Sequence, residues 1–403
     1  MKLRFNKTVA AVASSALLLM AAPAVDVASA SASGVPTYTI GYQGPLSGSY
    51  AYLGEYMYYG AMVAINNANA GTTFGKLPFK VKLAKFDDQG SSTLGPAQAQ
   101  AAIQTPGLIA VVGPAFSGAT EASEPYYSRA HVATVSPSAT AAALAKGSKN
   151  NFMRVVAGDD VQGAADANFL VKTHGAKSLV VINNGSFYGA GLAAVVSKTA
   201  KSDGATVTNY TDPTTGSCGG TASTTEYAAT ATQIMAAHPA AVYFGGYYCG
   251  FGLLLGALSS AGYTGIIMSD DGSWSTGLFG DTTPPTAANG VYVSEAGGGN
   301  ANLTGKLAAE FTKLSHQKAQ GATYAAQAYD ATNMIIKAAL SIKRSPNIKV
   351  LRAQLINKLH QLTFHGVTGV IHFQGNGDLS RNSIVEFAQA NATTKTFNVI
   401  GHS

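Results

Sequence analysis

Two successive series of alternating strand-like and helix-like segments constrain the fold of this chain more than any other feature. In each series, short apolar or alternating segments are followed by segments with apolar residues at helical spacing. The segment LIAVV at 108–112 is apolar throughout, which is typical of a parallel strand buried on both faces. The first series predicts strands at 38–43, 79–86, 108–112 and 132–135, and helices at 55–69, 94–104 and 119–129.

The second series repeats this alternation, and the tail of the chain departs from it. A strand followed by a helix and a further strand builds a parallel sheet with helices on its faces. We therefore expect an α/β protein with two doubly wound, mostly parallel sheets. The second series predicts strands at 178–182, 206–210, 241–244 and 266–269, and helices at 159–174, 190–202, 225–238 and 253–261. In the tail we expect helices at 303–316, 324–342 and 350–359, and strands at 368–373, 383–389 and 396–400, the last two as a hairpin.

The segment 1–30 has the pattern of a secretory signal peptide. Lys2, Arg4 and Lys7 precede an uncharged, mostly apolar run at 9–22, and the small residues ASA follow at 28–30. The run is shorter than the ~20 residues that a membrane span needs, which disfavours a membrane anchor. No Cys lies near the expected cleavage point, so no lipid attachment is expected there. We expect a mature protein that is periplasmic or secreted.

Composition and motifs exclude several classes of function. The chain has 403 residues, which predicts two or three domains, and 46% of them are hydrophobic. The net charge is +6, but no cluster of five or more Lys and Arg occurs, so no nucleic-acid partner is expected. The two Cys lack the spacing of a zinc site, and the chain has neither a GxSxG nor an HExxH motif. We expect no metal, no cofactor and no enzymatic activity; a secreted hydrolase is a disfavoured alternative.

Polar and aromatic residues follow several expected strands, at the edge where parallel sheets bind their ligands. Ser117 and Thr140 lie in neighbouring loops of small residues, each at an expected helix start. Helix starts attract anions, so these hydroxyls fit a carboxylate; ordinary N-capping is the alternative. Asp271 ends the last strand of the second series and either pairs with a ligand ammonium or caps a turn. Tyr188 and Tyr247 either pack on a ligand or belong to the core.

A set of short motifs, in order along the chain, resembles the periplasmic leucine/isoleucine/valine-binding protein family. These proteins are the solute-binding components of branched-chain amino acid ABC transporters. The resemblance covers nearly all of residues 38–390. The motifs are IGYQGPLSG at 40–48, FDD at 86–88, VG at 112–113, SPSAT at 136–140, FYG at 187–189, YFGGY at 243–247 and GNGD at 375–378.

The resemblance implies a two-lobed periplasmic-binding-protein fold with three hinge crossings, near 155–158, 291–294 and 370–373. Lobe one would comprise 36–156 plus 293–370, and lobe two would comprise 157–292 plus 371–403. The ligand would lie between the lobes, which close on it by a hinge motion. The implied partners are an amino acid ligand and, in the membrane, an ABC permease with its ATPase subunits. We expect a monomer.

The resemblance also implies a role for individual residues. The hydroxyls of Ser117 and Thr140, with backbone at Ser138 and Ala139, would hold the ligand carboxylate. Asp271 would hold the ammonium, while Tyr188 and Tyr247 would close over the ligand. Leu53 replaces an aromatic residue found in some members, which leaves the side-chain preference open. Residues that could shape the side-chain pocket are Tyr50, Tyr52, Phe116 and Trp274.

Two further questions stay open from the sequence. The ligand is either an amino acid with a branched or similar apolar side chain, or an amide, urea-like or aromatic acid solute. A ligand-sensing module with the same fold is the other alternative. Cys218 and Cys249 lie in loops that follow strands of the second series, and the expected compartment is oxidising, so we expect a disulfide between them.

Overall fold

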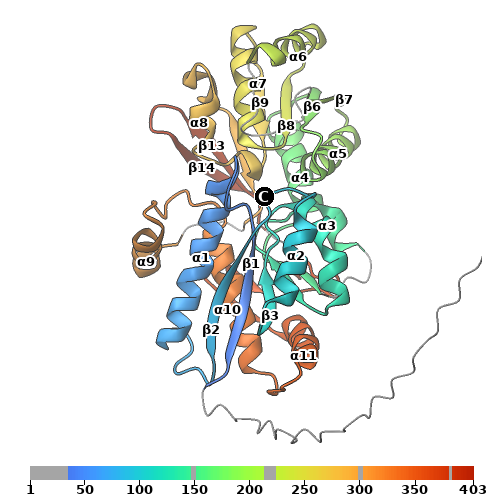
Figure 1. The fold of residues 1–403 in the computed structure, drawn as a ribbon. Helices are drawn as coiled ribbons and strands as arrows, with labels where there is room; N and C mark the ends of the chain where they lie inside the picture. The colour runs from blue at the N-terminus through green and yellow to red at the C-terminus, as the bar shows by residue number, and fades with distance from the viewer. Residues whose placement is uncertain (1–34, 147–150, 213–223, 298–302, 381–383) are drawn as a thin grey trace, which may run out of the picture. The chain divides into compact units, whose positions relative to one another are not determined.

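Two β-sheets, one parallel and one mostly parallel, organise the chain from Pro36 onward, as Figure 1 shows. The computed structural model describes residues 35–146, 151–212, 224–297, 303–380 and 384–403. The expected signal peptide and Cys218 lie outside these ranges. Cleavage and the disulfide to Cys249, which is buried at the start of α7 (Tyr248–Ser260), therefore stay predictions.

The first sheet has five parallel strands in the order β2-β1-β3-β4-β5. Four of them were expected from the sequence, whereas β5 was missed because its span is too short to show a periodicity. Three helices alternate with the strands, as βαβ units require. The elements are β1 (Thr37–Gly44), α1 (Ala51–Ala70), β2 (Lys80–Asp87), α2 (Gly95–Gln104), β3 (Leu108–Val112), α3 (Ser117–Arg129), β4 (Ala133–Ser136) and β5 (Phe152–Arg154).

Helices cover both faces of this sheet, and two of them come from the tail of the chain. Val111 packs with residues of α2 and α3. Ile109 and Val112 instead belong to the core that α1, α10 (Ala325–Leu340) and α11 (Ile348–Gln361) share. Figure 1 shows α1 and α10 side by side along the sheet. The tail therefore returns to the first sheet after the second one has been built.

The second sheet has seven strands in the order β14-β13-β10-β9-β8-β6-β7. The strands from β6 to β10 pair in parallel, whereas β13 and β14 form the expected antiparallel hairpin. Its helices are α4 (Asp159–Asn168), α5 (Phe187–Ser202), α6 (Thr224–Ala237) and α7. Its strands are β6 (Ser178–Asn183), β7 (Thr206–Thr211), β8 (Ala241–Gly245), β9 (Ile266–Ser269), β10 (Tyr292–Glu295), β13 (Glu386–Asn391) and β14 (Thr396–His402). The expected α/β fold is confirmed.

Several expected elements differ in detail. The helix expected at 159–174 is α-helical only to Asn168 and ends in a π-helical turn, η2 (Phe169–Thr173). The single strand expected at 368–373 is a two-stranded ribbon of β11 (Phe364–Gly366) and β12 (Gly369–Ile371). The remaining elements are η1 (Ala142–Ala145), η3 (Asp271–Ser273), α8 (Leu278–Asp281), η4 (Pro285–Ala288) and α9 (Gly305–Ser315).

Three connections run between elements of the two sheets: one follows β5, one follows β10, and one leads from β12 to β13. Hydrogen bonds join the first connection to the other two. The first follows β5, where the Ala157 amide donates to the Ala296 carbonyl (2.8 Å), just after β10. The buried Arg154 donates to Asp378 (2.6 Å), and its amide donates to the Gly377 carbonyl (3.1 Å). The second connection follows β10. The segment 291–294, which was expected to cross between the lobes, is largely this strand, and the strand pairs within the second sheet. The division into two lobes stays a prediction.

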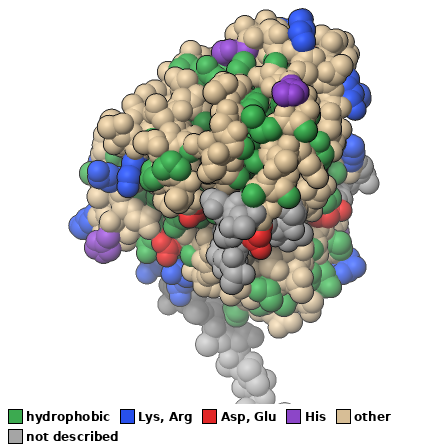
Figure 2. All heavy atoms as spheres, turned by 90° about the horizontal axis from the view of Figure 1, so that it is seen from above, with side chains coloured by type: hydrophobic (Ala, Val, Ile, Leu, Met, Phe, Trp, Pro, Cys, Tyr) green, Lys and Arg blue, Asp and Glu red, His purple; other side chains and the backbone are tan. Residues whose placement is uncertain are grey.

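The distribution of charged side chains on the surface agrees with the sequence, in which Lys and Arg are not clustered. On the face seen in Figure 2, Lys and Arg side chains are scattered singly or in small groups rather than gathered in one patch. Among the described residues, no helix has both the length and the apolar character needed to cross a membrane.

Candidate ligand-binding site

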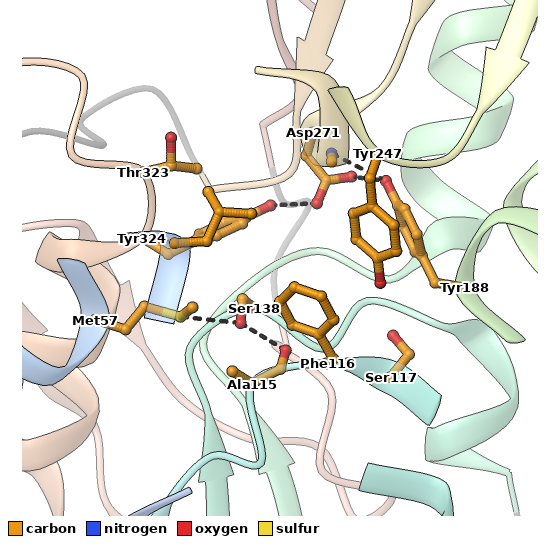
Figure 3. A pocket seen from close by; sticks show the side chains of 12 residues that line it. Met57, Ala115, Phe116, Ser117, Ser138, Tyr188, Tyr247, Asp271, Thr323 and Tyr324 are labelled. Atoms are coloured by element: carbon orange, nitrogen blue, oxygen red, sulfur yellow. Dashed lines mark hydrogen bonds between the residues drawn. The ribbon is translucent and has the colours of Figure 1, made fainter. Parts of the chain in front are cut away.

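Loops that follow strands of both sheets meet at one pocket, shown in Figure 3. The free volume inside it is small, about 30 Å³, so the lining side chains lie close together in this structure. The first sheet contributes the loops after β3 and β4, and the second sheet contributes the loops after β6, β8 and β9. Its walls are formed by Leu53, Met57, Ala115, Phe116, Ser117, Ser138, Tyr188, Tyr247, Asp271, Gly272, Thr323 and Tyr324.

The start of α3 supplies hydrogen-bond donors from the first sheet. Phe116 precedes the helix and no side chain caps it, so the amides of its first turn have no intrahelical partner. The Ser117 hydroxyl is not an N-cap; it accepts a hydrogen bond from the Ala141 amide (3.2 Å). Ser138 donates to the Ala115 carbonyl (2.7 Å) and contacts the Met57 sulfur (3.1 Å). This end of the pocket offers neutral donors and a helix dipole, which suit an anion.

The loop at 136–140 is fixed from behind the pocket. Ala139 and Thr140 are fully buried next to the lining residues, and the Thr140 hydroxyl has no hydrogen-bond partner among the described residues. The Arg154 guanidinium donates to the carbonyls of Thr140 (2.7 Å) and Ala141 (3.0 Å). The α-helix expected to start after this loop is absent from the described residues; the short 3₁₀ turn η1 follows the loop instead. Of the two helix starts expected here, only that of α3 borders the pocket.

Asp271 lies at the opposite end of the pocket, at the start of η3. Its two carboxylate oxygens accept hydrogen bonds from the hydroxyls of Tyr188 (2.5 Å) and Tyr324 (2.6 Å), as Figure 3 shows. Burial raises the pKa of Asp271 above its ordinary value, although these hydrogen bonds oppose the rise. A carboxylate has about four acceptor positions, so Asp271 retains capacity for a cation.

Asp159, which the sequence analysis did not select, is a second acid beside this end of the pocket. It is fully buried at the start of α4, and neither of its oxygens has a partner among the residues that the structure describes. Burial and the nearby charge of Asp271 raise its pKa well above the ordinary value, although the neighbouring Thr140 hydroxyl and the charge of Arg154 oppose the rise. An ammonium placed near both acids would satisfy acceptors that the protein leaves open.

Tyr324 was also missed, and it comes from the far tail of the chain. It precedes α10 in a left-handed backbone conformation (φ 62°), which is strained for a bulky residue. The conformation places its hydroxyl on Asp271, although the two residues lie far apart in the sequence. Strain kept at such a position indicates that the Tyr324–Asp271 contact is part of the site.

Aromatic rings close the pocket on one side. The rings of Phe116 and Tyr247 stack at 5.0 Å, and Tyr188 lies 5.5 Å from Tyr247. The Tyr50 ring centroid lies 5.0 Å from those of Phe116 and Tyr247, but Tyr50 does not line the pocket; it borders a separate surface depression of about 460 Å³ beyond this wall. Phe116 and Tyr50 follow strands of the first sheet, whereas Tyr188 and Tyr247 follow strands of the second. The wall is thus made by residues of both sheets.

Two residues expected to shape the pocket lie elsewhere. Tyr52 packs edge-on against Tyr248 at 5.7 Å, and Trp274 packs on Phe397 at 5.6 Å. Neither lines the pocket. The apolar wall is instead supplied by Leu53 and by residues such as Met57 on the same face of α1.

The architecture and this pocket agree with a comparison against known families, since residues 37–395 match the family described as periplasmic binding protein. The chain belongs to this family. It is 29% identical to a Leu/Ile/Val-binding protein of Rhizobium johnstonii, over 72% of this chain and 76% of the relative. It is 26% identical to the leucine-, isoleucine-, valine-, threonine- and alanine-binding protein of Pseudomonas aeruginosa, over 89% and 92%. The resemblance to Leu/Ile/Val-binding proteins is confirmed.

Solved structures share the fold at lower identity. A branched-chain amino acid transporter substrate-binding protein of Streptococcus pneumoniae, in complex with isoleucine, superposes with a TM-score of 0.74 at 24% identity, over 90% of this chain and 99% of that one. A solute-binding protein of Rhodopseudomonas palustris, in complex with 4-hydroxybenzoate, superposes with a TM-score of 0.72 at 16% identity, over 91% of this chain and 97% of that one. One fold therefore serves chemically different solutes, and the residues of the pocket have to decide between them.

Proposed function

We propose that this protein binds an α-amino acid with an apolar side chain between two lobes and delivers it to an ABC permease with its ATPase subunits. The observation that carries the proposal is the opposite chemistry of the two ends of the pocket. Neutral donors at the start of α3 face a buried carboxylate, Asp271, across an apolar space. An α-amino acid is the simplest solute that presents an anion, a cation and an apolar group together.

Each end of the ligand would contact a different sheet. The carboxylate would accept from the first-turn amides of α3 and from the hydroxyls of Ser117 and Thr140. The ammonium would donate to Asp271 and Asp159, whose pKa values are raised chiefly by burial. Because the two ends are held from opposite sides, the ligand would favour the closed arrangement and be recognised by the hinge motion itself.

The side-chain pocket would select apolar groups. Leu53, Met57, Phe116 and Tyr247 line it with carbon, sulfur and ring surfaces. Each buried methylene contributes about 0.8 kcal/mol, so a branched side chain is favoured over alanine. A benzoate-like solute would fit the rings but would leave Asp271 buried without a cation, which disfavours an aromatic acid.

The test is a calorimetric and thermal-shift comparison of matched solutes on the protein that lacks the segment 1–30. We expect leucine, isoleucine or valine to bind and to raise the melting temperature with concentration. The deaminated analogue, 4-methylpentanoate, and benzoate should bind at least about tenfold more weakly, because they lack the ammonium. Equal binding of 4-methylpentanoate would overturn the amino acid proposal and leave only the fold.

Export belongs to the same proposal. The signal-peptide pattern at 1–30 supports a protein that acts outside the cytoplasm, and the lack of a Cys near the cleavage point argues against lipid attachment there. We also propose that it acts as a monomer. Mass spectrometry of the exported protein should find the chain beginning after Ala30 or Ala32. Recovery of peptides from the segment 1–20 in the exported protein would contradict it.

A further inference from the structure

A second hollow lies next to the ligand pocket and contains an unexplained acid. Its free volume is about 360 Å³. Thr323 lines both spaces, and its hydroxyl donates to the Trp274 carbonyl (2.9 Å). Nothing in the proposed transport function requires this second hollow.

Two glutamates form its floor. Glu295 ends β10 and pairs directly with Glu386 of β13 in antiparallel register, so their side chains extend on the same face of the sheet. Glu295 is 1% exposed, and neither of its carboxylate oxygens has a hydrogen-bond partner among the described residues. Glu386 is 7% exposed and lies 3.7 Å from the His402 ring. Like charges opposite each other in a sheet are destabilising, so a cation bound between these two carboxylates would relieve their repulsion.

The walls of the hollow are aromatic on one side and carry lysines at the mouth. Trp274 and Phe397 lie with their ring centroids 5.6 Å apart. Ring faces attract organic cations, which adds to the attraction of the acids. Lys318 and Lys395 are exposed and line the same hollow, and no ion pair joins them to Glu295 within the described ranges.

A metal ion is a poorer occupant than an amine. The described part of the chain contains no group of three or more His, Cys, Asp or Glu side chains arranged to hold a metal. Two carboxylates and a pair of rings instead match an ammonium, which donates up to three hydrogen bonds. We propose that this hollow binds the ammonium group of a small amine.

The single tryptophan of the chain provides a direct probe, because Trp274 lines the hollow but not the ligand pocket. Purified protein would be titrated with n-butylammonium, 5-aminopentanoate and pentanoate while Trp274 fluorescence is followed. We expect the two amines to change the fluorescence saturably and pentanoate to have no effect. Response to pentanoate equal to that of the amines would mean that the rim lysines bind a carboxylate, and would overturn the proposal.

Variants separate this site from the ligand pocket. Glu295→Gln should weaken n-butylammonium binding at least about tenfold, because hydrogen bonds to a charged partner are among the stronger ones. Glu310→Gln is the matched control, since Glu310 pairs with Lys306 at 3.6 Å on α9 and should change nothing. Asp271→Asn should keep a saturable amine response and strengthen it at pH 7, because loss of the Asp271 charge lowers the pKa of Glu295. A response lost in Asp271→Asn but kept in Glu295→Gln would place the amine in the ligand pocket and refute the second site.

A proton readout checks the mechanism. Burial, with the charges of Glu386 and Asp271, raises the pKa of Glu295 to about 8. The other charged groups around it are Lys318 and Lys395 at the mouth and His402 beside Glu386. A bound ammonium favours the ionised acid, so binding at pH 7 should release protons and tighten as the pH rises towards 9. Calorimetry in buffers of different ionisation enthalpy measures this release, and a Glu295→Gln protein should show less of it. Equal release by both proteins would contradict the proposal.

Discussion

The two sides of the ligand pocket differ in the charge of the polar groups that the protein leaves open. On the first-sheet side, Ser117 and Ser138 have hydrogen-bond partners, and the loop behind them is held by Arg154. On the second-sheet side, Asp271 and its neighbour Asp159 are buried acids whose pKa values are raised. The groups left open on the first side, the Thr140 hydroxyl and the first-turn amides of α3, are neutral, whereas those on the second side are buried acids that call for a cation. The ammonium end should therefore dominate both affinity and discrimination between solutes.

Removing the acid of the incomplete side should have the largest effect. Asp271→Ala leaves a bound ammonium without its main counter-charge, and truncating one partner of a buried charge pair costs about 2–5 kcal/mol. We expect the affinity for the amino acid to fall by more than tenfold in calorimetry. The same variant should bind 4-methylpentanoate no more weakly than the unmodified protein does. Unchanged amino acid affinity would reverse the ranking of the two sides and assign the ammonium elsewhere.

Tyr324→Phe is a milder change on the same side, because it removes one hydrogen bond to Asp271 and keeps the carboxylate. A hydrogen bond to a charged group contributes about 1.5–3 kcal/mol, so we expect roughly a tenfold loss of affinity, offset in part if the ligand or water takes the position. The pKa of Asp271 should rise further, since one opposing hydrogen bond is gone. Binding needs the ionised acid, so affinity is lost as the pH is lowered. In the variant this loss should begin at a higher pH than in the unmodified protein. Superimposable pH profiles would show that Tyr324 only fills space.

Asp159→Asn tests whether the incomplete side lowers the stability of the empty protein. A raised pKa in the folded state means that stability is present below the ordinary pKa and is lost as the pH rises. The melting temperature of the unliganded protein should therefore fall with rising pH more steeply than that of Asp159→Asn. Ligand affinity should fall severalfold in the variant. A variant with the same pH dependence of melting would show that Asp159 is satisfied in the folded protein.

The same contrast explains which parts of the site could be predicted from the sequence. Ser117, Tyr188, Tyr247 and Asp271 each follow a strand of a strongly periodic series, and the edge of a parallel sheet brings such loops together. Asp159 could not be found in this way, since it follows a connection between the sheets and its Asp-Asp pair is also typical of a helix start. The fold itself was predictable, because the spacing of apolar residues along the chain shows which face of each strand and helix is buried.

Tyr324 and Met57 show the limit of that reasoning. Met57 lies within α1, where a buried apolar residue at helical spacing is indistinguishable from the core. Tyr324 reaches the pocket only because the tail of the chain returns to the first sheet, and its left-handed backbone leaves no sequence signature of the kind that Gly provides. Contacts that depend on a long-range return of the chain require the structure.

Ser117→Ala should have the smallest effect and is therefore the most sensitive check on the difference between the two sides. The Ser117 hydroxyl already accepts from the Ala141 amide, so only part of its hydrogen-bonding capacity remains for a ligand. The unpartnered amides at the start of α3 stay in place after the substitution, because they belong to the backbone. A net hydrogen bond contributes about 0.5–1.5 kcal/mol, so we expect a loss of severalfold at most, against more than tenfold for Asp271→Ala. If Ser117→Ala cost as much as Asp271→Ala in calorimetry, the carboxylate end would share the control of affinity, and its binding of the ligand would depend on this one hydroxyl.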